Sequence, residues 1–166
     1  TLAQVMGDCL AVALLDRRGF RPEDFRVLHP GGVIGRTASR RVEELMHAGA
    51  AVPRVAESTP LREVMLEIMD KRLGITTVLD AAGRLAGVVS DGDFKRILVR
   101  HPDPWGLVAG DVMTRSPSLI AKDALVAAAV RAMEERAAGP ITALVVVDDE
   151  RRPLGVLHLH DCLRAG

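Results

Sequence analysis

The sequence is poor in aromatic residues and has no excess of charge of either sign. Only 2% of its 166 residues are aromatic whereas 48% are hydrophobic, so we expect an aliphatic core. The formal net charge is zero and no long basic run occurs, which argues against a nucleic-acid-binding protein, because such proteins usually present a basic face. The few aromatic side chains also offer no platform on which bases would stack.

Cysteine and long apolar runs are scarce as well. Cys9 and Cys162 lie near opposite ends of the chain, so we expect no disulfide framework but two buried free thiols in a cytoplasmic protein. No apolar run approaches the ~20 residues that a membrane span requires. Residues 1–15 include Gln4 and Asp8 and lack a basic start, a pattern unlike that of a signal peptide.

The first segment has the spacing of a helix. Its apolar residues recur every three or four positions, and they are Leu2, Val5, Met6, Cys9, Leu10, Ala13 and Leu14. Gly19 follows as a left-handed helix stop. Residues 29–32, with the sequence His-Pro-Gly-Gly, do not continue a helix and predict an irregular loop.

The rest of the chain contains an internal repeat, which decides the expected fold. The offset between corresponding residues drifts from 64 to 68 positions, which indicates short loop insertions. The corresponding pairs are Met46 with Met113, Leu61 with Leu125, Met69 with Met133, Gly87 with Gly155, and Asp93 with Asp161.

Each copy predicts the order strand, helix, strand, strand, helix. In the first copy, Thr59 and Pro60 are typical of a helix start, and Leu61, Val64, Met65, Ile68 and Met69 form an apolar stripe. Strands are expected at 75–79 and 85–90, and a short helix at 91–99. In the second copy we expect a helix at 123–136, strands at 141–147 and 154–158, and a last helix from about His160. Residues 101–106 link the copies.

These features resemble a tandem pair of cystathionine-β-synthase-type (CBS) domains. The matching residues are Met46 and Met113, the run Gly-Val-Val-Ser-Asp-Gly-Asp at 87–93, and Gly155 and Asp161 in the second copy. The resemblance implies an α+β fold in which CBS domain 1 (42–100) and CBS domain 2 (108–166) pack about a pseudo-twofold axis. Because each small sheet has an open apolar face, the other copy is its simplest cover.

The remainder of the chain resembles sugar isomerases. Residues 1–36, with Gly7, Asp8, Gly19, Phe20 and the 29–32 loop, are similar to the end of a sugar-isomerase (SIS) domain. The closing residues 155–166 are similar to the end of the D-arabinose-5-phosphate isomerase family. That family interconverts D-ribulose 5-phosphate and D-arabinose 5-phosphate for the synthesis of Kdo, an acid sugar of lipopolysaccharide.

Ser90 and Asp93 are the first candidate ligand-binding residues. The resemblance implies that the Asp93 carboxylate contacts ribose hydroxyls, and Ser90 with the following helix N-terminus is suited to phosphate. The alternative is simple helix capping by both side chains. Lys95 and Arg96 add charge nearby or are merely solvated.

The second copy departs from this pattern, because His158 replaces the hydroxyl residue although Asp161 is retained. Its half-site therefore prefers another ligand group or binds nothing. His158 and His160 alone are too few ligands for zinc, so no metal and no cofactor is expected. Four further polar residues flank the expected strands and helices of the cleft, or cap them: Ser58, Thr76, Asp111 and Thr142.

His29 is implied to be a catalytic residue by the isomerase resemblance, since aldose–ketose isomerisation requires proton transfer. Its phosphate-binding and acid–base partners are missing from this sequence, so we expect it to be idle and the chain itself to be inactive.

Three hypotheses follow. The pair senses a nucleotide or nucleotide-sugar effector, either CMP-Kdo or an adenosine nucleotide, and regulates an attached isomerase of this or another sugar phosphate. Alternatively, the chain is itself an isomerase, or it is a ligand-free oligomerisation module. The resemblance implies a dimer, and a tetramer in the parent protein. From charge and hydropathy we expect no nucleic-acid and no membrane partner.

Overall fold

The structure is a computed structural model that describes residues 2–19 and 39–165. Residues 37–165 form one compact unit, and the N-terminal residues form another. The N-terminal unit contains helix α1 (Leu2–Arg17), and Gly19 after it has a φ of 62°, so the predicted helix and its left-handed stop are confirmed.

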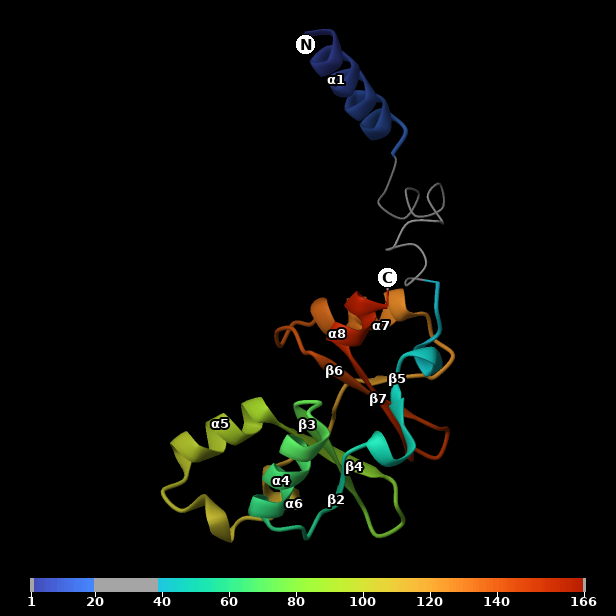
Figure 1. Ribbon diagram of the computed structural model, residues 1–166. Coiled ribbons are helices and arrows are strands. Elements are labelled where there is room, and N and C mark those ends of the chain that lie inside the picture. Colours follow the sequence, from blue (N-terminus) through green and yellow to red (C-terminus); the bar gives the residue numbers. More distant parts are fainter. Residues whose placement is uncertain (1, 20–38, 166) are drawn as a thin grey trace. The chain divides into compact units, whose positions relative to one another are not determined.

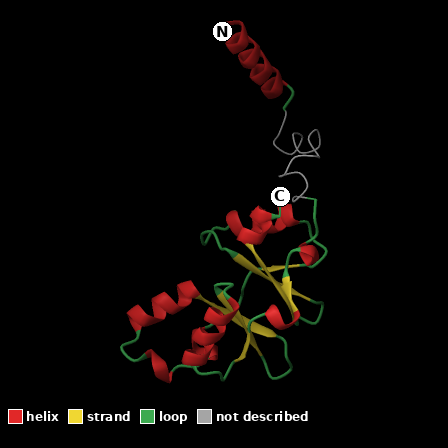
Figure 2. Cartoon of the chain, viewed as in Figure 1, coloured by secondary structure: helices red, strands yellow, loops and turns green. Residues whose placement is uncertain are grey.

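The compact unit contains two repeats with the same element order, as the sequence predicts (Figures 1 and 2). The first repeat consists of β2 (Arg54–Ala56), α4 (Leu61–Lys71), β3 (Ile75–Leu79), β4 (Leu85–Ser90) and α5 (Asp91–Arg100). The second consists of β5 (Leu119–Ile120), α7 (Val126–Glu134), β6 (Ala143–Val147), β7 (Pro153–His158) and α8 (Leu159–Arg164). The short helices η3 (Pro104–Gly106) and α6 (Ala109–Val112) lie between them.

The two sheets have the same core topology. One sheet has the order β2-β3-β4, and the other has the order β1-β7-β6-β5, where β1 is the short strand His47–Ala48. In each, the first strand of the repeat runs parallel to the second and the last two are antiparallel. In Figure 1, α4 and α5 accompany the sheet of the first repeat, and α7 and α8 that of the second.

Each repeat is completed by the residues that lead into the other one. Residues 41–48, the first crossing segment, include η1 (Val42–Glu44) and β1, and His47 pairs with Val156 of β7. Residues 107–114, the second crossing segment, include α6 and form the corresponding bridge between Thr114 and Val88 of β4. The short helix η2 (Gly49–Ala51) then leads from β1 to β2. The repeats are thus interlocked by their backbones as well as by side chains.

Two glycines make these crossings possible. A Cβ on Gly87 would lie 2.7 Å from the Thr114 carbonyl oxygen and 2.8 Å from the Met113 Sδ. A Cβ on Gly155 would lie 2.6 Å from the Met46 Sδ and 2.8 Å from the carbonyl oxygen of the next residue, His47. In each repeat, the strand glycine therefore lets a crossing segment and its methionine pack directly against the strand backbone. The glycine and the methionine recur in both copies and make the same contact in each.

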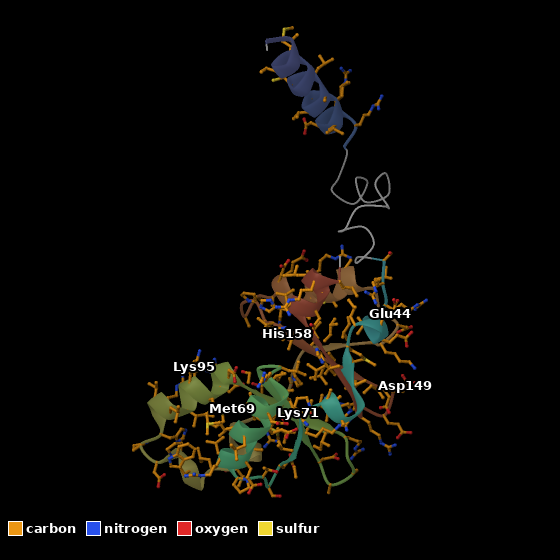
Figure 3. All side chains as sticks on the ribbon, in the orientation of Figure 1. Glu44, Met69, Lys71, Lys95, Asp149 and His158 are labelled. Atoms are coloured by element: carbon orange, nitrogen blue, oxygen red, sulfur yellow. The ribbon has the colours of Figure 1, made fainter. Side chains whose placement is uncertain are left out.

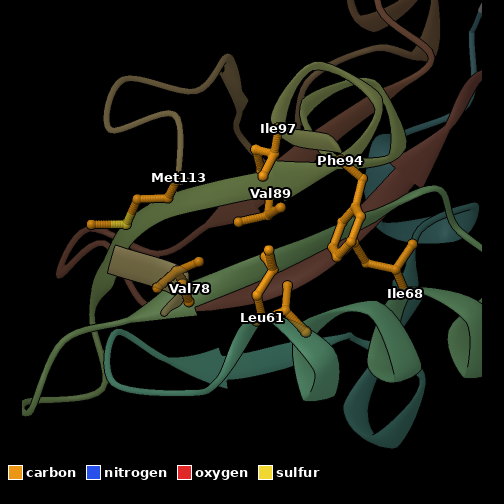
Figure 4. Close-up of a cluster of buried hydrophobic side chains, with 9 residues drawn as sticks. Leu61, Ile68, Val78, Val89, Phe94, Ile97 and Met113 are labelled. Carbon is orange, nitrogen blue, oxygen red and sulfur yellow. The ribbon is translucent and has the colours of Figure 1, made fainter. Parts of the chain in front are cut away.

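Three apolar clusters form the core, and all are aliphatic apart from Phe94. The first cluster lies between α4, α5 and the sheet of the first repeat and includes Met113 from the second crossing segment (Figure 4). The second, around Leu144 and Met133, includes Val42 from the first crossing segment. The third joins the sheets of the two repeats through Ile75, Val88, Ala143, Val145 and Val156, among others. This cluster confirms that each sheet covers the apolar face of the other.

Several sequence expectations differ from the structure in detail. Met69, labelled in Figure 3, is 63% exposed, so the buried stripe of α4 consists of Leu61, Val64 and Ile68. Cys9 is exposed, and only Cys162 is buried. Helix α7 begins at Val126 rather than Asp123, because the backbone of residues 122–125 pairs with the first crossing segment.

Candidate functional site

A cavity of about 720 Å³ lies between the two repeats. One wall comes from the first repeat at residues 72–75 and 88–96, and the other from the second repeat at 136–145 and 158. The second crossing segment and the residues after it, Thr114 to Ser118, form a third side. The apolar part of the lining includes the buried residues Ile75, Val88, Ala143 and Val145, so the cavity combines an apolar floor with polar groups around it.

Ser90 and Asp93 lie in this cavity at the N-terminus of α5, where they form a reciprocal cap. The Asp93 Oδ2 accepts hydrogen bonds from the Ser90 backbone N at 2.8 Å and from the Ser90 Oγ at 2.7 Å. The Ser90 Oγ in turn accepts from the Asp93 backbone N at 3.3 Å. Each satisfies a backbone donor that the first turn of a helix leaves free. Ser90 and Asp93 therefore do cap the helix, which is the alternative role that the sequence suggests for them.

Asp93 nevertheless lines the cavity and has a second carboxylate oxygen. The side chain of Arg96 pairs with Oδ1, the oxygen that the cap does not use. The Asp93 side chain is 11% exposed whereas that of Arg96 is 58% exposed, so Arg96 is a solvated partner that can move aside. A carboxylate oriented by two hydrogen bonds and held against the cavity can accept hydrogen bonds from vicinal hydroxyls.

The second repeat has a different arrangement at the corresponding place. His158 caps α8 through Nδ1, which accepts from the His160 backbone N at 3.3 Å, and the two rings stack with centroids 5.2 Å apart. Burial lowers the pKa of His158, while the nearby Asp161 carboxylate opposes that shift. His158, labelled at the end of β7 in Figure 3, lines the cavity. A neutral imidazole therefore takes the place of the serine hydroxyl.

Asp161 is engaged by the first crossing segment. The His47 Nε2 lies 2.8 Å from the Asp161 Oδ2, and both side chains are about one-third exposed. Asp161 does not contribute to the cavity wall, although its counterpart Asp93 does. The two half-sites are therefore unequal, because one carboxylate faces the cavity and the other pairs with a histidine of the other repeat.

The other residues proposed from sequence are scattered. Thr142 lines the cavity. Ser58 and Asp111 are exposed outside it, and Asp111 accepts a hydrogen bond from the Val108 N at 3.1 Å as a helix cap. Thr76 is fully buried in β3, and its Oγ1 has no hydrogen-bond partner among the described residues. His29 lies outside the residues that the structure describes.

Sequence reasoning named Arg96 but missed the two other arginines of the cavity, Arg72 and Arg136. Three guanidinium groups line it, from Arg72, Arg96 and Arg136, against the two carboxylates of Asp91 and Asp93. The repeat itself carried the signal, because Arg72 and Arg136 each follow a matching methionine by three positions. The cavity therefore has a positive balance that favours an anionic ligand.

Other kinds of site find less support. Within residues 2–19 and 39–165, no group of three or more His, Cys, Asp or Glu side chains could hold a metal ion. Burial raises the pKa of the Cys162 thiol to about 11, so this cysteine is protonated and unreactive at neutral pH. In the same described part of the chain, no helix is long and apolar enough to cross a membrane.

Comparison with known proteins gives consistent results. The family model described as "CBS domain" matches residues 42–100 and again 109–166. The arabinose 5-phosphate isomerase KdsD of Pseudomonas aeruginosa is 45% identical over 166 residues, which are 100% of this chain and 50% of that protein. KdsD of Yersinia pestis is 43% identical over the same span, which is 49% of its length. The chain thus spans about half the length of the curated relatives it matches.

A solved structure has the same fold. The crystal structure of CBSX2 in complex with AMP superimposes with a TM-score of 0.64 at 27% identity, covering 75% of this chain and 94% of that one. CBSX2 from Arabidopsis thaliana, called a CBS-pair protein, gives a TM-score of 0.63 at 26% identity, covering 76% and 94%.

Proposed function

The chain belongs to the CBS domain family, and from this premise we propose that it is the ligand-sensing regulatory part of an arabinose 5-phosphate isomerase. The observation that carries the proposal is the cavity between the two domains, which combines a buried carboxylate, a helix N-terminus and a positive charge balance. The KdsD relatives support the choice of isomerase, and the AMP complex of CBSX2 supports a nucleotide-like effector.

The proposed binding mode follows the chemistry of the cavity. Asp93 accepts hydrogen bonds from the two ribose hydroxyls and displaces Arg96 from its outer oxygen. The start of α5, a helix of ten residues, receives the phosphate through the Gly92 N–H and through the Ser90 hydroxyl, which turns away from Asp93 to donate to it. The base lies against the apolar floor formed by Ile75, Val88 and Ala143. Thr142 and His158 contact the part of the effector that projects toward the second domain.

The effector itself is proposed to be a nucleotide of the pathway or of central metabolism. Feedback from the end of the Kdo pathway favours CMP-Kdo, which carries a ribose, a phosphate, a base and a carboxylate. An adenosine nucleotide is the alternative, in line with the AMP complex of CBSX2. We place the protein in the cytoplasm, where these metabolites are found.

The catalytic part of the proposed isomerase lies outside this chain. Residues 1–36 are proposed to be the end of its SIS domain, and the exposed apolar side chains of α1, including Val5, Met6 and Leu10, suit a helix that other parts of such a domain cover. The whole protein would interconvert D-ribulose 5-phosphate and D-arabinose 5-phosphate. We expect the present chain, in whose sequence His29 lacks its partners, to turn over neither sugar in a coupled assay.

The sensing proposal is tested by ligand-induced stabilisation. A ligand that binds only the folded state at a hundredfold excess over its Kd adds about 2.7 kcal/mol of stability. We expect CMP-Kdo, or else AMP, to raise the melting temperature, and the increase to shrink in Asp93→Asn. The control is Asp149→Asn, an exposed loop residue outside the cavity wall, which retains the full shift. If neither nucleotide shifts the melting temperature at millimolar concentration, the sensing proposal fails.

A ligand-free oligomerisation module is the second candidate, and exposed apolar side chains favour it. They lie on the long helices of the first repeat and on the last helix: Leu66 56%, Met69 63%, Leu98 53%, Val99 87% and Leu163 66% exposed. Such a surface is suited to self-association into a dimer, with a tetramer in the whole protein. Sedimentation equilibrium distinguishes the two states, and a clean monomer at micromolar concentration excludes the oligomerisation module.

A further inference from the structure

Two arginines from corresponding positions of the two repeats line the same cavity. Arg72 follows Met69 by three residues and is the C-cap of α4. Arg136 follows Met133 by three residues and lies just after Glu135, the C-cap of α7. Both line the cavity, Arg72 on the wall of the first repeat and Arg136 on the wall of the second.

The loop that carries Arg136 is longer than its counterpart. From Met69 to Ile75 there are six positions, and from Met133 to the corresponding Ala143 there are ten, so the second repeat has four more residues here. Within the extra residues, Gly139 turns with a φ of 94° and Pro140 follows it. Both contribute to the cavity wall. The insertion therefore extends the cavity on the side of Arg136.

The side chain of neither arginine has a hydrogen-bond or ion-pair partner within residues 2–19 and 39–165, whereas that of Arg96 is paired with Asp93. The cavity then contains two unpaired guanidinium groups and one further carboxylate, Asp91, at its exposed edge. Arg72 is exposed and Arg136 is half-buried, so both guanidinium groups keep their charge beside the cavity and favour an anionic ligand there.

The ends of the helices do not explain this arrangement. A cation near a helix C-terminus interacts favourably with the helix dipole, and each arginine has such a position. However, α7 already has Arg131 in its last turn, and α4 has Lys71 in its own. Neither Arg131 nor Lys71 lines the cavity. The dipole therefore accounts for a positive charge on each helix but not for two arginines on one cavity.

We infer that Arg72 and Arg136 form a second anion subsite, which selects a nucleotide carrying another anionic group beyond the phosphate bound at Ser90. The inference rests on the proposed function, which supplies the nucleotide at Asp93 and the start of α5. The ligand class is a nucleoside diphosphate or a nucleotide-linked sugar acid rather than a nucleoside monophosphate. Guanidinium groups bind both phosphate and carboxylate in a bidentate manner, so either group fits.

The experiment compares matched ligands by isothermal titration calorimetry. The pairs are ADP against AMP, for a second phosphate, and CMP-N-acetylneuraminate against CMP, for a sugar carboxylate. Inorganic pyrophosphate is the probe without a nucleoside. The variants are Arg72→Gln, Arg136→Gln and both together, and the control is Arg131→Gln, which removes an exposed arginine of α7 outside the cavity.

We expect ADP to bind at least ~10-fold tighter than AMP, or CMP-N-acetylneuraminate at least ~10-fold tighter than CMP. The reason is that charge-assisted hydrogen bonds are among the stronger ones. This preference should fall toward unity in the double variant and persist in Arg131→Gln. Melting temperatures without ligand identify any loss of folding, and a variant that unfolds is replaced by the corresponding lysine variant, which keeps the charge but loses the bidentate geometry.

The outcomes separate the inference from the proposed function. If monophosphates bind as tightly as their partners, or the preference survives in the double variant, the subsite is refuted while nucleotide binding stands. If no nucleotide binds but pyrophosphate binds and is lost in the double variant, the proposed function fails and the anion subsite stands. If none of the five probes binds, both are refuted.

Discussion

The crossing of the two repeats over Gly87 is the feature whose perturbation is most directly predicted. In Gly87→Ala, the new methyl group meets the Thr114 carbonyl oxygen at 2.7 Å and the Met113 Sδ at 2.8 Å. The methionine side chain can move, but the carbonyl belongs to a backbone that is bonded to β4. The Val88 N donates to the Thr114 O at 3.0 Å, and the Thr114 N donates to the Val88 O at 2.8 Å.

The expected cost follows from three contributions. Overpacking of a well-packed site costs about 1–3 kcal/mol. Loss or lengthening of one of the two backbone hydrogen bonds costs about 1 kcal/mol more. Replacing glycine reduces the freedom of the unfolded chain and returns about 0.5–1 kcal/mol. The net expectation is a decrease of about 2 kcal/mol in the free energy of unfolding, a large share of the ~5–15 kcal/mol typical of a domain.

Urea unfolding followed by circular dichroism measures this change, with reversibility checked by refolding. The matched control is Gly106→Ala, because a Cβ on Gly106 has no neighbour within 4 Å. This control should be neutral or slightly stabilising. Gly155→Ala should behave like Gly87→Ala, since its Cβ would meet the Met46 Sδ at 2.6 Å. If Gly87→Ala unfolds at the same urea concentration as the control, the crossing does not constrain the fold as argued.

Three further predictions concern the core, the thiols and pH. Leu61→Ala should lower the free energy of unfolding by about 2–5 kcal/mol, because Leu61 is fully buried, whereas the 56% exposed Leu66 should tolerate alanine; urea unfolding checks both. In the native protein a thiol reagent should modify Cys9 rapidly, and Cys162 only after unfolding, because Cys162 is buried with a pKa of about 11; two fast thiols in the native state would contradict this. The pKa of His158 is lowered in the folded state, so the unfolded chain binds the proton more readily and stability falls as the pH drops below 6.5; His158→Asn should lose less stability between pH 7 and pH 5, and an unchanged slope would refute the role of this residue.

Local signals in the sequence were sufficient to predict most of the secondary structure. The strands at 75–79 and 85–90 have the predicted bounds, because continuous β-branched and aliphatic runs end there at Gly or at a capping residue. Helix α5 begins at Asp91 as predicted, after Ser90 as its N-cap. The internal repeat also predicted that the two domains pack together, because each of two similar sheets with an open apolar face can cover the other.

Helix starts were less predictable where backbone groups are used by the other repeat. Thr59 was expected to cap α4, but the N-cap is Pro60, and the Thr59 Oγ1 accepts from the Ala56 N at 3.0 Å instead. The reason is tertiary, because the Thr59 O accepts from the Ala109 N and the Leu61 N donates to the Leu107 O. The same kind of pairing shortens the start of α7. No local pattern reveals that a partner far along the chain will take these groups.

The candidate site likewise has local features that the sequence predicted and long-range contacts that it did not. The residue types at 90 and 93 were sufficient to point to a cap and a carboxylate next to a helix start, because these are local interactions over three residues. The pairing of His47 with Asp161 spans 114 positions, and sequence reasoning did not find it. Sequence reasoning also did not find that Arg72 and Arg136 line the same cavity.

By itself, the sequence determined the repeat, the strands and the α+β class, because these depend on composition and spacing within each copy. The tertiary structure decided which polar groups face a common cavity and which are already paired. That outcome depends on the crossing segments, which carry His47 to the second repeat and Thr114 to the first. The repeated methionine and glycine mark this crossing alike in both copies, so only the folded chain shows that the two half-sites are unequal.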